Sequence, residues 1–141
     1  MISRVRSATA KAVVDSALIV QRAAMANAPK ETGNLARSIK ITGPFVAGRD
    51  TWKAMVGPTT VYGRQRELGG HIYPKNVTWM RWADPAGKYG YLHRSWGTPG
   101  FAYSQHVYQR PQPYLHPAVD ESLVEIRKRF ADRIGAAMKG V

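Results

Sequence analysis

The fold is decided by residues 28–39, which read APKETGNLARSI. Pro29 ends any helix before it, because proline lacks an N–H and its ring clashes with the preceding turn. Thr32 is a residue type that caps helices, and Leu35 and Ile39 share one helical face because they are four positions apart. The stretch therefore predicts a single helical turn that runs directly into a strand.

Upstream of this stretch, residues 3–27 contain no glycine or proline and are rich in alanine. Their apolar residues recur at helical spacing, which predicts one long helix. At 1.5 Å per residue the helix would measure roughly 37 Å, too long for so small a domain to cover on all sides. We expect part of it to pack on another subunit.

The same segment has some features of a secretory signal. Arg4, Arg6 and Lys11 precede an apolar stretch, and residues 24–26 read AMA, like a small-residue cleavage site. Asp15 interrupts the apolar stretch, which favours a helix with a polar face. No apolar run approaches the roughly 20 residues that cross a bilayer, so we expect no transmembrane helix and no membrane partner.

A second long helix is predicted over residues 117–138. Pro117 suits the first position of a helix, where its missing N–H costs nothing, and Asp120 and Glu121 fall in the first turn. Apolar residues follow at steps of three and four, as on the buried face of a helix.

Between the helices the sequence is typical of short strands. Large apolar residues alternate over 51–56, and 61–68 predicts a short helix ended by two glycines. Residues 77–82 and 103–108 are the strongest further strand candidates.

These elements predict a single α+β domain, in which the two helices pack on a small, mostly antiparallel sheet. The predicted parts are a helix over 3–27, a sheet over 39–82 with a short helix near 61–68, an extended loop or hairpin insertion over 83–110, and a helix over 117–138.

Aromatic residues are concentrated in one segment. Ten of the fourteen aromatic residues lie between Tyr73 and Tyr114, among several prolines and glycines. Flexible linkers lack aromatic residues, whereas large rings need a surface to bury against. The segment is therefore not a linker, and we expect residues 84–100 to form an exposed excursion at its tip.

The charge is strongly basic. Lys and Arg total 21 against 9 Asp and Glu, a formal net charge of +12 with a pI near 10.4. Residues 33–119 hold 11 basic and 3 acidic residues and so carry +8 of this charge. Such a balance implies an anionic partner or an assembly that neutralises it.

Catalytic chemistry has little support. The chain has no cysteine, which excludes disulfides, thiolate metal sites and cysteine nucleophiles. His71, His93, His106 and His116 are not spaced three or four apart, as paired metal ligands on a helix would be. Serine occurs in no G-x-S-x-G setting, and acidic residues are too scattered to form a pair. We expect no enzyme, cofactor or metal site.

Nucleic-acid binding is the main alternative. Aromatic residues interleave with Lys75, Arg81, Lys88, Arg94 and Arg110, so rings could stack on bases while cations contact phosphates. The residues match no RNP, KH, zinc-finger or helix-turn-helix signature, and Tyr, Trp and Arg are also enriched in protein interfaces. A basic single-stranded nucleic-acid-binding module therefore stays open beside a protein-binding role.

Three strings occur in a fixed order: residues 28–39, then 61–70, which read VYGRQRELGG, then 110–118, which read RPQPYLHPA. Together with the flanking helices they resemble the gene product ten-like family of neck and tail-completion proteins of long-tailed bacteriophages. That family follows the pattern P-x-x-T-G-x-L-x-x-S-I, then Y-A-x-x-x-E-x-G, then P-x-P-Y/F-L-x-P-A. The resemblance covers nearly the whole chain.

The resemblance implies a non-enzymatic virion protein, assembled in the host bacterial cytoplasm as a homo-oligomeric ring of six copies at the head–tail junction. As an adaptor, stopper or tail terminator it would join the capsid connector to the tail-tube protein. Six copies would carry about +72, too much like charge to gather unless acidic neighbouring rings or passing DNA offset it.

The motif residues are expected to have two roles. A structural role is expected for Pro29, Thr32, Gly33, Leu35, Ile39, Pro113, Tyr114, Leu115 and Pro117. Contact with a neighbouring subunit or ring is expected for Tyr62, Arg64, Arg66, Glu67, Tyr89, Tyr91, Trp96, Phe101 and Tyr103. For Tyr62 and Glu67, a packed tyrosine and a solvated glutamate explain the sequence equally well.

Two positions depart from the family pattern. Gly63 stands where the family has alanine, and 68–70 read LGG where an aromatic residue, glycine and threonine are commoner. The aromatic segment is also longer than in the shortest relatives, and we expect its tip to reach an adjacent subunit or ring.

Overall fold

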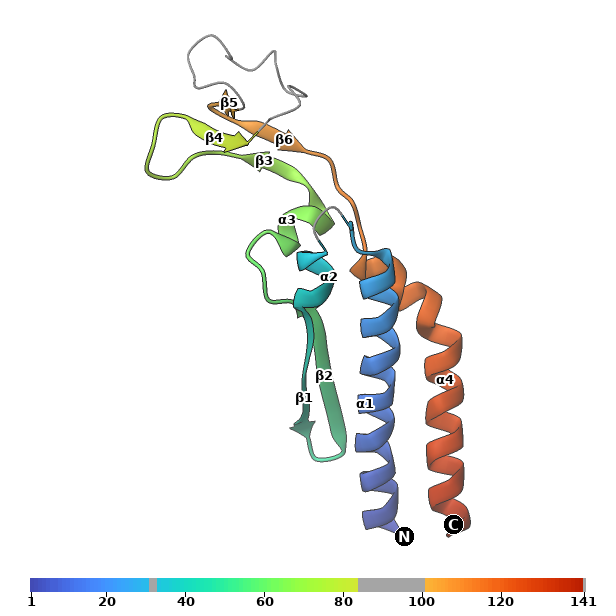
Figure 1. Cartoon of the computed structure of the whole chain (residues 1–141). Coiled ribbons are helices and arrows are strands. Elements are labelled where there is room, and N and C mark those ends of the chain that lie inside the picture. Colours follow the sequence, from blue (N-terminus) through green and yellow to red (C-terminus); the bar gives the residue numbers. More distant parts are fainter. Residues whose placement is uncertain (31–32, 84–100, 141) are drawn as a thin grey trace.

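A computed structural model describes residues 1–30, 33–83 and 101–140. The chain is α+β, as predicted, with two long helices beside small antiparallel strand pairs. Helix α1 spans Ile2–Asn27 and α4 spans Leu115–Lys139. They lie side by side and antiparallel, so that the two chain ends meet at one end of the molecule (Figure 1).

Small residues allow the two helices to approach. The residues that α1 buries are Ala8, Ala12, Ala17, Val20 and Ala24, of which four are alanines. On α4 only Ala118 and Ser122 are buried. Alanine at a helix contact brings the backbones close but buries little apolar area per residue.

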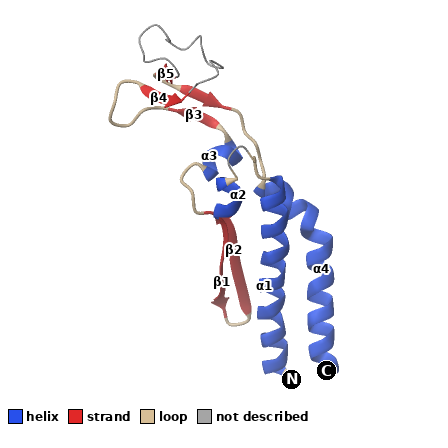
Figure 2. Cartoon of the chain, in the orientation of Figure 1, coloured by secondary structure: helices blue, strands red, loops and turns tan. Residues whose placement is uncertain are grey.

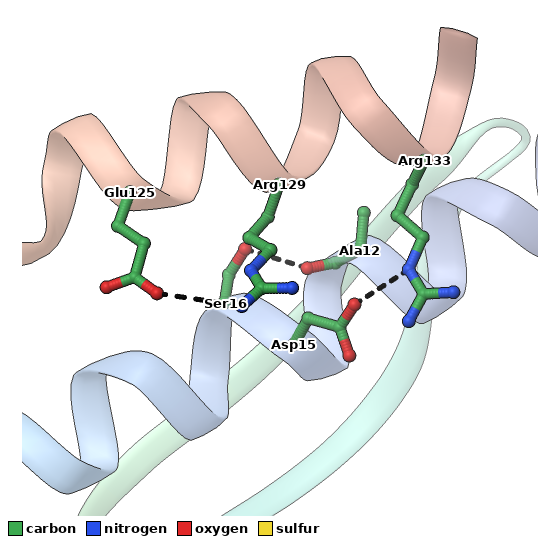
Figure 3. Close-up of polar contacts among 6 residues, drawn as sticks. All are labelled: Ala12, Asp15, Ser16, Glu125, Arg129 and Arg133. Carbon is green, nitrogen blue, oxygen red and sulfur yellow. Dashed lines mark hydrogen bonds and ion pairs between the residues drawn. The ribbon is translucent and has the colours of Figure 1, made fainter. Parts of the chain in front are cut away.

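Polar contacts link the exposed edges of the helix pair. Figure 3 shows Arg133 reaching from α4 to Asp15 of α1, with Nε and Oδ2 2.8 Å apart. Within α4, Arg129 lies 3.8 Å from Glu125, and within α1 Ser16 donates a hydrogen bond to the carbonyl of Ala12. Both partners of the Arg129–Glu125 pair are exposed, so this pair contributes little to stability.

A β-hairpin packs on the other side of α1 (Figure 1). It consists of β1, Ile39–Gly48, and β2, Thr51–Pro58, joined in antiparallel register. Arg6 of α1 binds Asp50 at the hairpin tip at 2.8 Å, and Gln21 donates to the carbonyl of Ile39 at its base. Helix α1 is thus held between the hairpin and α4.

The short elements connect the hairpin to an arm of strands. Helix α2, Asn34–Ser38, precedes β1, and α3, Gly63–Leu68, follows β2. The arm then runs away from the long helices as two further antiparallel pairs (Figure 2). The pairs are β3, Gly70–Ile72, with β6, Val107–Gln109, and β4, Met80–Ala83, with β5, Phe101–Ser104.

The predicted elements are present, with shifted boundaries. The strand predicted over 77–82 begins only at Met80, because the chain bends between Ile72 and Met80. The strand predicted over 103–108 is two strands, because the hydroxyl of Ser104 bonds the backbone of His106 and closes a turn. The strands also form three separate pairs instead of one sheet within the described residues.

Candidate functional site: the junction of three sequence motifs

Glu67, in the second motif, caps the helix that the third motif begins. Its Oε2 accepts hydrogen bonds from the backbone N–H groups of Tyr114 at 2.7 Å and Leu115 at 3.0 Å. Its Oε1 accepts one from His116 at 2.9 Å, and the next residue, Pro117, has no N–H. A helix start leaves its first N–H groups without helical partners. Here one carboxylate accepts hydrogen bonds from all three N–H groups of Tyr114, Leu115 and His116.

This cap explains why α4 begins at Leu115, two residues before the predicted start. Tyr114 occupies the N-cap position and forms no side-chain cap. The negative charge that favours a helix start comes from a different segment, 47 residues away in the sequence. Pro117 therefore lies in the first turn of the helix and does not open it.

The cap also determines how Glu67 titrates. Burial raises the pKa of this carboxyl, but the N–H groups of Leu115, Tyr114 and His116, together with the charge of His116, outweigh burial. The pKa of Glu67 in the folded chain is therefore below its ordinary value of 4.5. Folding is favoured by the ionised form of this residue.

We predict that this carboxyl makes the protein less stable in acid. A depressed folded pKa adds stability that is complete above about pH 4.5 and is lost as the pH falls through the folded pKa. Urea unfolding of the wild-type chain and Glu67→Gln from pH 6 to pH 3 measures this directly. The stability gap should narrow towards pH 3, and a gap that does not change with pH would contradict the titration of Glu67.

Tyr114 is the fully buried centre of the junction. Its hydroxyl donates to the carbonyl oxygen of Gly63 at 3.2 Å. Burial, reinforced by the charge of Glu67 and by Tyr62, raises the pKa of Tyr114 to about 12. The ring stays neutral and acts as a packed hydrogen-bond donor.

Gly63, the first departure from the family pattern, has a steric cause. A Cβ atom at this position would lie 2.3 Å from Cγ of Pro58 and 3.2 Å from the hydroxyl oxygen of Tyr114. The proline ring that ends β2 thus occupies the space that an alanine methyl would need.

The second and third motifs also join along their backbones. The N–H of Gln112 donates to the carbonyl of Arg66 at 2.7 Å, and the Arg66 guanidinium donates to the Gln112 side chain. Gly69 has a φ of +66°, and a Cβ there would lie 2.6 Å from the nitrogen of Pro111. This accounts for Gly69, the glycine that ends the family pattern of the second motif, because α3 ends where the returning chain passes against it.

The first motif completes the junction. Leu35 and Ile39 are buried in one cluster with Tyr114 and Ala118, together with the end of α1. The carbonyl of Ser38 accepts the N–H of Thr59. Gly33 adopts a left-handed conformation before α2, with φ +69°, and Thr32 lies outside the described residues. All three motifs therefore contribute to one packed unit.

The residues predicted to contact a neighbouring subunit or ring do not lie together. Tyr62, at the N-cap of α3, and Arg64, within it, are exposed near Val61 and Leu68. Arg66 and Glu67 instead have partners within the chain. In the arm, the guanidinium of Arg81 lies 4.8 Å above the ring of Phe101, and Arg81 pairs across the strands with Tyr103. Tyr89, Tyr91 and Trp96 lie outside the described residues.

Sequence reasoning missed an apolar groove of about 490 Å³ along α1. It ends at the junction, beside Glu67, Leu115 and His116. Its remaining lining comes from α1 (Val13, Ser16, Ala17 and Val20), β2 (Ala54 and Val56) and α4 (Val119 and Phe130). The helical spacing of these residues marks an apolar face, but only the placement of β2 and α4 determines which part stays open.

The ranges 1–30, 33–83 and 101–140 hold no group of three metal-ligating side chains. Ser104 bonds the backbone of His106 and not its imidazole, so these neighbours form a turn. No helix in the same ranges is both long and apolar enough to cross a membrane.

The chain was compared with models of protein families, with curated proteins and with solved structures, and none of the three comparisons found a match.

Proposed function

We propose that this chain is a structural subunit of a long-tailed bacteriophage particle and acts through assembly instead of catalysis. In this proposal, copies of the chain, six by the family resemblance, form a ring at the head–tail junction. The ring joins the capsid connector above it to the tail tube below it.

One observation carries this proposal: the three motifs of the resemblance meet at one junction. The first and third motifs are separated by 70 residues of sequence, yet Glu67 and Tyr114 link the second to the third and Ile39 packs with Tyr114. Short motifs that occur separately by chance would have no reason to converge. Their convergence supports a shared architecture, which is what a family with a structural role would have in common.

A second observation supports self-association. Seven of the eleven buried apolar residues in the described chain are alanines, while many larger apolar side chains are exposed. The alanines bury little area, so the isolated chain has a sparse core. Large apolar residues left at the surface are typical of a subunit whose interface is incomplete. We assign the groove along α1 to contact with the adjacent copy in the ring.

Placing a charge in the groove should prevent assembly. Val119 lines the groove and is 42% exposed, so Val119→Asp leaves the monomer folded but buries a carboxylate against the neighbour. We expect the protein concentration needed for assembly to rise about 100-fold or more. Analytical ultracentrifugation of both proteins measures it.

Val124→Asp is the matched control. Val124 is on the same helix and 78% exposed, and it does not line the groove. The Val124→Asp variant should assemble as the wild-type chain does. If both variants lose assembly equally, or if neither does, the groove is not part of the interface.

The location in the particle needs a genetic test. In a phage genome that encodes this chain, a stop codon early in the gene should yield DNA-filled heads and separate tails, visible by electron microscopy. Supplying the full chain from a plasmid should restore joined particles. Normal particles without the chain would overturn the proposed function.

A further inference from the structure

Four aromatic side chains form an exposed cluster on the β3–β6 pair and the residues next to it: His71 and Tyr108 lie on the strands, and Tyr73 and His106 directly adjoin them. His71 lies opposite Tyr108 in the register, and its ring centroid is 5.1 Å from that of Tyr108, 5.6 Å from that of His106 and 6.2 Å from that of Tyr73. The rings of His71, Tyr73 and His106 are within 33° of parallel to one another. Centroid separations of about 4.5–7 Å are typical of aromatic rings that gather in one cluster.

This surface, which we call the four-ring face, faces solvent. Tyr73 is 64% exposed and Tyr108 is 56% exposed, and both histidines are exposed. Because these rings are exposed, burial in the core does not explain why they gather here. The arm that carries them lies away from α1 and α4 (Figure 1).

Cations continue the same pattern of exposure. Exposed and less exposed residues alternate over 71–75 and over 106–110. Lys75 therefore continues the exposed series of His71 and Tyr73, and Arg110 continues that of His106 and Tyr108. Residues 69–83 and 101–113 of the arm contain Lys75, Arg81 and Arg110 and neither aspartate nor glutamate. The four-ring face therefore lies in a part of the arm whose formal charge is positive throughout.

We propose that the four-ring face binds single-stranded nucleic acid. Flat rings stack on unpaired bases of any sequence, and flanking cations attract the phosphates, a combination typical of single-strand binding surfaces. Charge complementarity favours a polyanion over a second copy of this chain, because another copy would present the same positive charge. Paired bases cannot reach the rings, since their faces are covered within the duplex. This inference does not depend on the proposed ring function.

The test is fluorescence anisotropy of a labelled 20-nucleotide oligo-dT with the full chain, beside a duplex of the same length. We expect oligo-dT to bind more tightly than duplex at matched salt. Stacking on a ring contributes about 1–3 kcal/mol per base, so Tyr73→Ala and Tyr108→Ala should each weaken binding about 5-fold to 100-fold. Both tyrosines are exposed, and thermal unfolding checks that the variants stay folded.

Two controls separate stacking from general attraction. Phe45→Ala removes an exposed ring of β1, outside the arm, and should leave oligo-dT binding unchanged. Lys75→Gln and Arg110→Gln should each flatten the salt dependence of binding by removing a phosphate contact. The proposal is overturned if the tyrosine variants bind oligo-dT as the wild type does, or if duplex binds equally well. It is also overturned if these variants alter only the mass of the assembly, which would make the face a protein interface.

Discussion

Glu67→Gln should lower the free energy of unfolding by about 2–3 kcal/mol at pH 7. The carboxylate accepts three backbone N–H groups at the start of α4, through both of its oxygens. Glutamine keeps one oxygen, loses the charge, and turns an N–H₂ group towards a backbone donor. A charge-assisted cap is worth more than a neutral one, so the isosteric change is costly.

Glu125→Gln is the control for this substitution. Glu125 is on α4, is exposed, and pairs with Arg129 at 3.8 Å, so its loss should cost less than about 0.5 kcal/mol. Urea denaturation below the protein concentration at which the chain assembles compares the variants without a contribution from assembly. If Glu67→Gln and Glu125→Gln unfold at the same urea concentration, the carboxylate does not hold the junction together.

Gly63→Ala should destabilise the chain by about 1–3 kcal/mol, although alanine is the better helix former. The new methyl group would lie 2.3 Å from the ring of Pro58, and that ring cannot rotate away. The strain would also reach Tyr114, whose hydroxyl bonds the carbonyl of Gly63. Thermal unfolding followed by circular dichroism measures the loss.

The same substitution elsewhere should have the opposite effect. A Cβ at Gly135, inside α4, would meet nothing within 4 Å, so Gly135→Ala should stabilise the chain by about 0.5–1 kcal/mol. Combining Gly63→Ala with Pro58→Ala should recover part of the loss, because it removes the ring in the way. A Gly63→Ala variant as stable as the wild type would show that β2 and α3 are not packed this closely.

Local patterns predicted the elements whose causes are local. The helix over 3–27 follows from apolar spacing and from the absence of glycine and proline, and the helix over 117–138 follows from apolar spacing. The helical turn after Pro29 is also present, although Gly33 and not Thr32 occupies its N-cap position. The predicted boundary of a helix was wrong where a group distant in the sequence determines it. Pro117 matches the usual signal for a helix start, but the helix begins at Leu115 because Glu67 binds the earlier N–H groups.

The candidate surfaces were harder to predict, because they depend on which segments meet. The alternation of His71 and Tyr73, and of His106 and Tyr108, is present in the sequence. Nothing local indicates that β3 pairs with β6 across more than thirty residues, and the four-ring face exists only through that pairing. The role of Glu67 had one weak signal, namely that the helix beginning after Tyr114 has no capping side chain of its own.

The mass of the assembly that the full chain forms is the most direct test of the proposed ring. Native mass spectrometry at micromolar concentration should give one closed species of a single copy number, six by the family resemblance. The same species should form with Val124→Asp and be replaced by monomer with Val119→Asp. A wild-type chain that stays monomeric, or that forms open series of many masses, would contradict the ring and the role of the groove in it.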